Sequence, residues 1–122
     1  MTRLLCALAS LSFFIITASH SLAHHGWSWT TGANIDLTGI IKSAKLGNPH
    51  GIVSVDVEGV TWTIEVGQPW RNERAGLADA DFTAGNKMRF VGEPSADTSQ
   101  KLMKAERIYI GDKEFKLYPD RD

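Results

Sequence analysis

From Ile35 onward, apolar and polar residues alternate with a period of two, which is typical of strands that are buried on one face. This alternation predicts a first strand over residues 35–41, a second over 53–57 and a third over 60–66. Glu58-Gly59 separates the second strand from the third and favours a tight hairpin turn between them. We therefore expect the three strands to form a meander.

The alternation stops after the third predicted strand. Pro69 suits the first turn of a helix and Gly76 suits its end, so a short helix or a turn-rich crossover is expected over residues 70–77. Further strands are expected over residues 87–92, 102–110 and 114–118. This order predicts a mainly β fold, a small OB-like barrel of five or six strands with one short helix after the third strand.

The amino-terminal residues do not follow the strand pattern. Arg3 precedes an apolar run over residues 4–16, and Ser21-Leu22-Ala23 is a small-x-small ending that places the cleavage site between Ala23 and His24. These features are typical of a secretory signal peptide, and the run is shorter than the ~20 residues of a membrane-spanning anchor, the alternative interpretation. We expect residues 1–23 to be removed, leaving residues 24–122 as one periplasmic domain without a stable membrane anchor.

Removal of the signal changes the chemistry that the chain offers. The single cysteine, Cys6, is lost with it, so neither a disulfide nor a thiolate ligand is expected. The remaining residues carry 12 basic and 14 acidic side chains, and this balance argues against nucleic-acid binding. Serine-hydrolase, phosphate-loop and zinc-protease motifs are missing from the sequence, so a binding protein is favoured over an enzyme.

Three histidines carry the candidate metal chemistry. Cleavage before His24 would expose its α-amine beside its ring Nδ1, and the two nitrogens can chelate one ion. His50, in the loop over residues 47–51, is the expected partner, with His25 a further candidate and Glu65 a weaker oxygen ligand. Nitrogen ligands of this kind favour Cu(II). The alternatives are a solvated terminus without a ligand and a His50 that only caps a turn.

The four tryptophans suggest a second function. Trp62 is in register with Ile64 and is expected in the core, whereas Trp27 could either tie the terminus to the barrel or shield a metal. Trp70, next to Arg71, could cover the end of the barrel or expose a stacking surface. OB-like barrels do bind oligomers through such rings. A non-metal module for a small or oligomeric envelope ligand, or for a protein partner, is therefore the alternative.

Seven short segments carry a family resemblance: Ala23-His24-His25, Leu37-Thr38-Gly39, Asn48-Pro49-His50, Trp62-Thr63-Ile64-Glu65, Gly76-Leu77, Ala84-Gly85-Asn86-Lys87 and Val91-Gly92-Glu93-Pro94. Taken in this order, they resemble the DUF6152 family of small exported bacterial proteins of unknown function. The resemblance implies a periplasmic OB-like barrel, and the family pattern includes the same His-His and Asn-Pro-His positions. The sequence departs from the family at Gly26-Trp27, where serine followed by phenylalanine is more usual.

Overall fold

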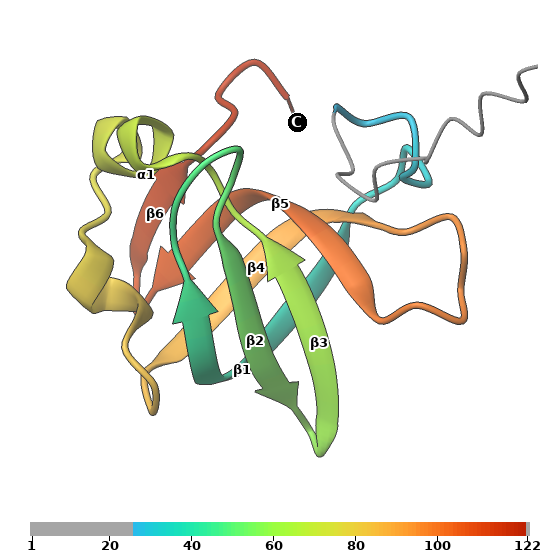
Figure 1. Cartoon of the computed structure of the whole chain (residues 1–122), viewed down its shortest axis with the longest axis horizontal. Coiled ribbons are helices and arrows are strands. Elements are labelled where there is room, and N and C mark those ends of the chain that lie inside the picture. The colour runs from blue at the N-terminus through green and yellow to red at the C-terminus, as the bar shows by residue number, and fades with distance from the viewer. Residues whose placement is uncertain (1–25, 122) are drawn as a thin grey trace, which may run out of the picture.

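The computed structural model describes residues 26–121, and its strands and helices follow the predicted order (Figure 1). One difference is a 3-10 helix over residues 79–82 that the sequence did not predict, and the others lie at the ends of elements. The first strand continues past Ile41 through four exposed residues, where the alternation of apolar residues has stopped. The elements are β1 (Ile35–Lys45), β2 (Ile52–Val57), β3 (Val60–Glu65), α1 (Pro69–Ala75), a 3-10 helix (Asp79–Phe82), β4 (Lys87–Pro94), β5 (Leu102–Ile110) and β6 (Lys113–Lys116).

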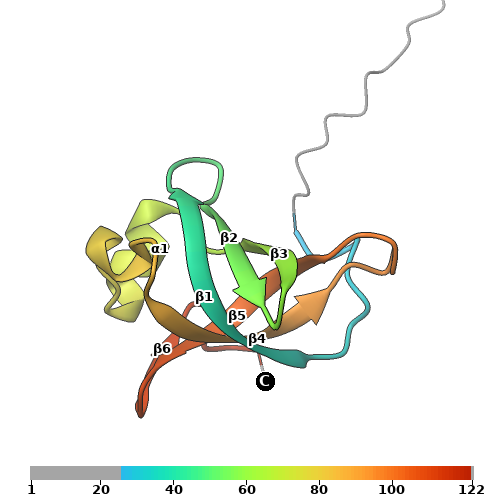
Figure 2. The same cartoon turned by 90° about the horizontal axis from the view of Figure 1, so that it is seen from below.

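The strands close into a barrel. Their order in the sheet is β3-β2-β1-β4-β5-β6, and a parallel pairing of β3 with β5 joins the two sides (Figure 2). Five strands therefore form the closed barrel, and β6 adds to the outside of β5. This topology, with a helix between β3 and β4, confirms the predicted mainly β, OB-like fold.

Strand β1 belongs to both halves of the barrel. Its first half, from Ile35 to Ile40, pairs with β4, and its second half, up to Lys45, pairs with β2. Gly39 lies where the strand changes partner, and a Cβ there would overlap the carbonyl oxygen of Asp56. The absence of a side chain therefore lets β1 bend closely over β2.

Alternating side chains fill the barrel. Most inward residues of β2 to β5 are fully buried, whereas Val57 and Trp62 are partly buried and pack against this core rather than inside it. The Glu58-Gly59 turn adopts positive φ at both residues (51° and 84°), as a two-residue hairpin with a primed turn requires. The core residues are Ile41, Val53, Val55, Ile64, Val66, Leu77, Phe82, Met88, Phe90, Met103, Ala105, Ile108, Phe115 and Leu117.

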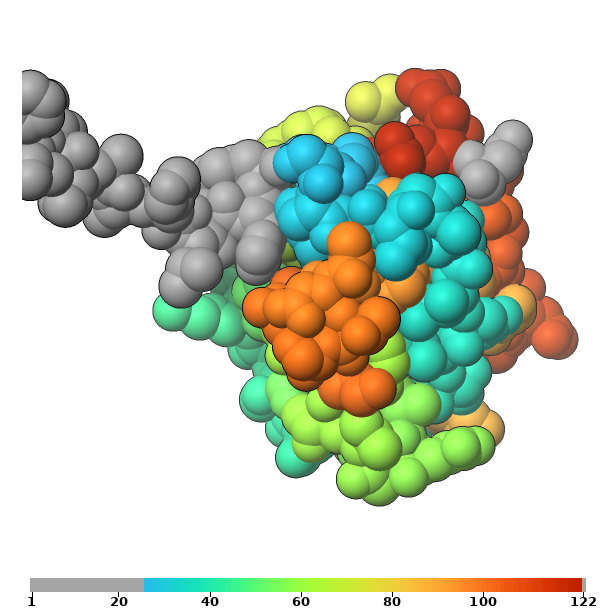
Figure 3. Space-filling view, turned by 90° about the vertical axis from the view of Figure 1, so that its right-hand side faces the viewer, coloured from blue at the N-terminus to red at the C-terminus, as the bar shows by residue number. Residues whose placement is uncertain are grey.

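The helix and the amino-terminal segment lie on different parts of the barrel. Helix α1 begins at Pro69 and ends at Ala75, and Gly76, with φ of 101°, caps the last turn, as predicted. Residues 26–34 lie against the β4–β5 loop, where Thr30 forms a bridge with Ser95 (Figure 3). Among the described residues, no helix is long and apolar enough to cross a bilayer.

Candidate functional site

His50 lies against Glu65 at the end of β3. Gly51 donates its N–H to the Gly67 carbonyl at 3.0 Å and accepts one from Val66 at 2.9 Å, which fastens the β1–β2 loop beside this strand end. The loop brings His50 Nε2 to 3.3 Å from Glu65 Oε2. The His50 side chain is 16% exposed and that of Glu65 only 2%. The ring is therefore held on a buried carboxylate while part of it stays accessible.

Glu65 also contacts a buried lysine. The parallel pairing of β3 with β5 puts Glu65 opposite Lys104, and Lys104 Nζ lies 3.5 Å from Glu65 Oε1. Burial raises the pKa of Glu65 to about 7, although the Lys104 ammonium opposes this shift. Burial likewise lowers the pKa of Lys104, against the attraction of Glu65. We call these three residues the His50–Glu65–Lys104 cluster.

Within the cluster, Glu65 and Lys104 point away from the core, yet both are buried. Ile64 and Met103 face the interior, so their neighbours Glu65 and Lys104 project from the outer face of the barrel wall. The sequence therefore predicted the direction of Glu65 correctly, but not its burial. The outer face is covered here because residues 26–34, at the start of the described chain and far away in the sequence, pack on it.

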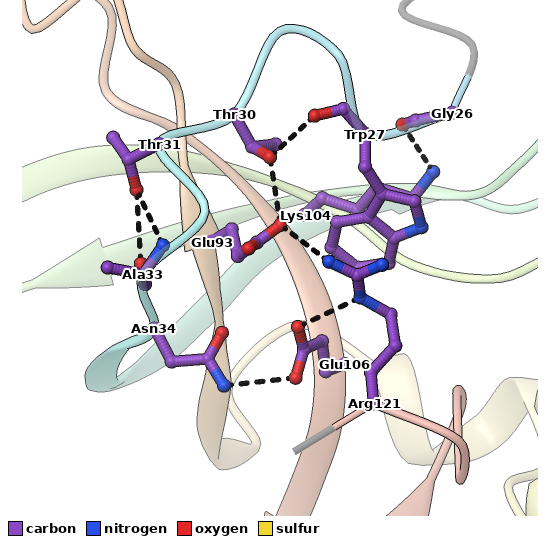
Figure 4. Close-up of polar contacts among 10 residues, drawn as sticks. All are labelled: Gly26, Trp27, Thr30, Thr31, Ala33, Asn34, Glu93, Lys104, Glu106 and Arg121. Carbon is purple, nitrogen blue, oxygen red and sulfur yellow. Dashed lines mark hydrogen bonds and ion pairs between the residues drawn. The ribbon is translucent and has the colours of Figure 1, made fainter.

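Lys104 connects the cluster to this amino-terminal segment. Its Nζ donates a hydrogen bond to the Gly26 carbonyl oxygen at 2.8 Å and lies 4.6 Å from the centre of the Trp27 ring (Figure 4). The ring of Tyr118 lies 5.5 Å from the same ammonium. A continuous series of polar contacts therefore runs from His50 through Glu65 and Lys104 to Gly26.

Two hollows meet at His50. One, of about 400 Å³, lies along the β3–β5 junction, and the other, of about 370 Å³, lies along the β1–β2 loop. His50 and Ile52 line both of them. Glu65 lines the first hollow together with Thr63, Gln100, Lys101 and Leu102. The site is thus open enough for an ion or a small group to approach the ring of His50.

The family model of DUF6152, a family of unknown function, matches residues 12–104. The chain belongs to the DUF6152 family. His50, Glu65 and Lys104 lie inside the matched region of this DUF6152 member, whereas Tyr118 lies beyond it. No curated protein matches the sequence. The membership confirms the resemblance, and it brings no activity with it.

The predicted site residues of this DUF6152 protein fall into three groups. His24 and His25, like the predicted signal over residues 1–23, lie outside the described residues. His50 and Glu65 are brought together, and Trp27 packs near them on Lys104. Trp70 lies apart on α1, 51% exposed. Within residues 26–121, no group of three or more histidine, cysteine, aspartate or glutamate residues could hold a metal ion.

Sequence reasoning missed the polar neighbours of the cluster. Lys104, Glu93 and Glu106 are each at most 6% exposed, and all three sit on strands where alternation predicts a solvated outward face. The pairing of Glu93 with Lys104 across β4 and β5 brings them together. Only the strand register and the covering segments reveal this burial, so no local sequence signal could have found it.

Proposed function

We propose that the protein is a periplasmic metal-binding protein that holds Cu(II) between the amino-terminal histidine and His50, for copper binding, delivery or tolerance. The observation that carries this proposal is the contact of His50 Nε2 with Glu65 at 3.3 Å. A metal-binding histidine almost always donates its other ring N–H to a carboxylate, a backbone carbonyl or a water, and this partner orients the ring and raises its basicity. Because Nε2 is directed at Glu65, the proposal assigns the metal to Nδ1 of His50.

The position of Gly26 supports the second half of the proposed site. The contacts from His50 to Gly26 involve only Glu65 and Lys104, so the two ends of this series are close in space. His24 is two residues from Gly26 in the sequence, and two extended residues span about 7 Å. Signal cleavage before His24 would add its α-amine, and an amine with two imidazoles suits the preference of Cu(II) for nitrogen ligands.

In this arrangement Glu65 is not a ligand. Its carboxylate fixes the His50 ring and connects it to Lys104, whose ammonium compensates the buried negative charge. Removing such a supporting carboxylate typically lowers metal affinity by about 10- to 100-fold. In Glu65→Gln the amide can still contact the His50 ring. The variant therefore distinguishes a Glu65 that supports the ring from a Glu65 that coordinates the metal directly.

The test uses the full chain, expressed with its signal and purified after processing. Intact mass establishes the first residue, and calorimetry then measures Cu(II) affinity for wild type, His24→Ala and His50→Ala. Each variant is expected to bind at least tenfold more weakly than wild type. Gln100→Ala is the matched control, since Gln100 lines the same hollow without being a proposed ligand. Equal, weak binding by wild type and both histidine variants would show that the copper proposal is wrong.

A neighbouring surface, which shares Tyr118 with the surroundings of Lys104, favours the second candidate, a non-metal module for an envelope ligand. The Arg71 guanidinium carbon lies 4.6 Å from the exposed Trp70 ring and 4.2 Å from the Tyr118 ring, while NH1 donates to the Leu117 carbonyl at 3.0 Å. A hollow of about 170 Å³ beside Arg71 is lined by three cations, Arg71, Arg74 and Lys116, and also by the acidic Asp120.

A stacking ring beside fixed cations suits an anionic ligand such as an acidic sugar. Titration with glucuronate, followed by NMR, is expected to shift the Trp70 indole in wild type and not in Arg74→Gln. No shift in wild type at millimolar glucuronate would contradict this candidate function.

A further inference from the structure

The segment over residues 118–121 reaches across to the face that carries the candidate site. Arg121 Nε lies 3.2 Å from Glu106 Oε1, and its NH2 lies 3.2 Å from Glu93 Oε2 (Figure 4). Both glutamates are almost fully buried, on β5 and β4 respectively. One guanidinium therefore bridges two neighbouring strands through two buried carboxylates.

The same guanidinium covers Trp27. The Arg121 guanidinium carbon lies 3.9 Å from the centre of the Trp27 ring, the shortest of the distances from the ring to its charged and aromatic neighbours among the described residues. Tyr118 meets this ring edge-on, with centroids 5.1 Å apart and an angle of 81° between the planes. Trp27 is thus held by Arg121 and Tyr118 from one segment and by Lys104 from the barrel wall.

The two glutamates that bind Arg121 also bind the amino-terminal segment. Thr30 Oγ1 lies 2.8 Å from Glu93 Oε2 and 2.8 Å from the Trp27 carbonyl oxygen. Asn34 Nδ2 donates a hydrogen bond to Glu106 Oε2 at 3.0 Å. Residues 26–34 and 118–121 therefore share the same anchors, and neither segment packs independently of the other.

We propose that residues 118–121 form a clasp and that Arg121 is a positioning residue. Its planar guanidinium pairs with two carboxylates along its edge while its face stacks on Trp27, a combination that a lysine cannot reproduce. By holding Trp27, the clasp keeps the Gly26 carbonyl on Lys104, at the end of the series of contacts that runs through Glu65 to His50. The effect on metal affinity rests on the proposed function, whereas the effect on the segment does not.

Arg121→Gln tests the clasp in the processed protein, and Arg89→Gln is the matched control. Arg89 also pairs with a carboxylate, that of Asp36, and stacks on a ring, that of Tyr109 at 4.5 Å, but it lies toward the other end of β4. Hydrogen exchange is followed at the amides of Thr30 and Thr31, which bond to Trp27 and Pro94. Arg121→Gln is expected to speed this exchange at least tenfold, and Arg89→Gln to leave it unchanged.

Cu(II) binding provides the second measurement. Arg121→Gln is expected to weaken Cu(II) binding at least tenfold and to change the EPR spectrum of the bound ion, with partial recovery in Arg121→Lys. Trp27→Leu removes the stacked ring but leaves the two carboxylates paired with Arg121. It replaces Arg121→Gln in both measurements if that variant fails to fold, and the same changes are expected from it.

The outcomes are distinguishable. Exchange that stays at the wild-type rate in Arg121→Gln and Trp27→Leu overturns the clasp. Faster exchange with an unchanged copper affinity and EPR spectrum overturns the positioning role. A wild type that binds no Cu(II), together with faster exchange in the variants, overturns the proposed function and the positioning role and supports the clasp alone.

Discussion

Because of Glu65, the free energy of unfolding of the metal-free protein is expected to fall as the pH rises. Burial raises the pKa of this carboxyl to about 7 in the folded chain, against an ordinary value of 4.5. The folded protein thus binds this proton more tightly than the unfolded chain does. The associated stability is fully present below pH of about 4.5 and is lost as the pH rises through 7.

The expected magnitude follows from these two values. The full shift corresponds to about 3.4 kcal/mol, of which about 2.5 kcal/mol is lost between pH 5 and pH 8. This is a large part of the ~5–15 kcal/mol that stabilises a domain of ordinary size. Glu65→Gln cannot ionise, so the variant is expected to lack this loss. The groups that face Glu65 are His50, Lys104 and Tyr118, and all three remain in the variant.

Urea unfolding at pH 5 and pH 8, in the presence of a chelator, measures both free energies. Wild type is expected to lose about 2.5 kcal/mol more than Glu65→Gln over this interval. Glu114→Gln is the control, because its carboxyl is exposed and hydrogen-bonded to Tyr109, which lowers its pKa out of this range. If the free energies of unfolding of wild type and Glu65→Gln change between pH 5 and pH 8 by the same amount within about 0.5 kcal/mol, the argument that burial raises the pKa of Glu65 is refuted.

Three further outcomes are expected. Gly92→Ala would place a Cβ against the Lys104 carbonyl oxygen and 2.8 Å from Ala105 Cα, so urea unfolding should show a loss of stability above about 3 kcal/mol. Gly111→Asn, at a glycine in open space, should cost under about 1 kcal/mol. Phe90→Ala, in the fully buried core, should cost about 3–5 kcal/mol in thermal unfolding. Lowering the pH from 7.5 to 5.5 should weaken Cu(II) binding at least tenfold by calorimetry, because the amine and imidazoles must lose protons.

The barrel could be predicted because its strands carry their own pattern. Alternation marks β2 and β3 residue by residue, and Glu58-Gly59 supplies the two positive φ angles of their turn. Gly76 marks the end of α1 for the same local reason, a left-handed residue after the last turn. The extension of β1 to Lys45 was missed, since its last residues are exposed and follow no apolar alternation.

The candidate site was only half predictable. The loop that carries His50 is visible in the sequence, and its contact with Glu65 follows from the barrel topology. The burial of Glu65, Lys104 and Glu106 is not visible, because it depends on segments from both ends of the described chain meeting on one outer face. A period of two tells which side of a strand a residue occupies, but it cannot tell whether another segment covers that side.

Attaching the amino-terminal segment to the barrel through buried charged side chains carries a desolvation cost. Glu65, Glu93 and Glu106 are at most 2% exposed, and their cations come from Lys104 and Arg121. Apolar side chains of similar volume often stabilise a protein as well as buried ion pairs do. Such side chains would cover the face equally, but they would fix neither the Gly26 carbonyl nor the His50 ring. We infer that the polar face serves the geometry of the amino-terminal segment rather than the stability of the barrel.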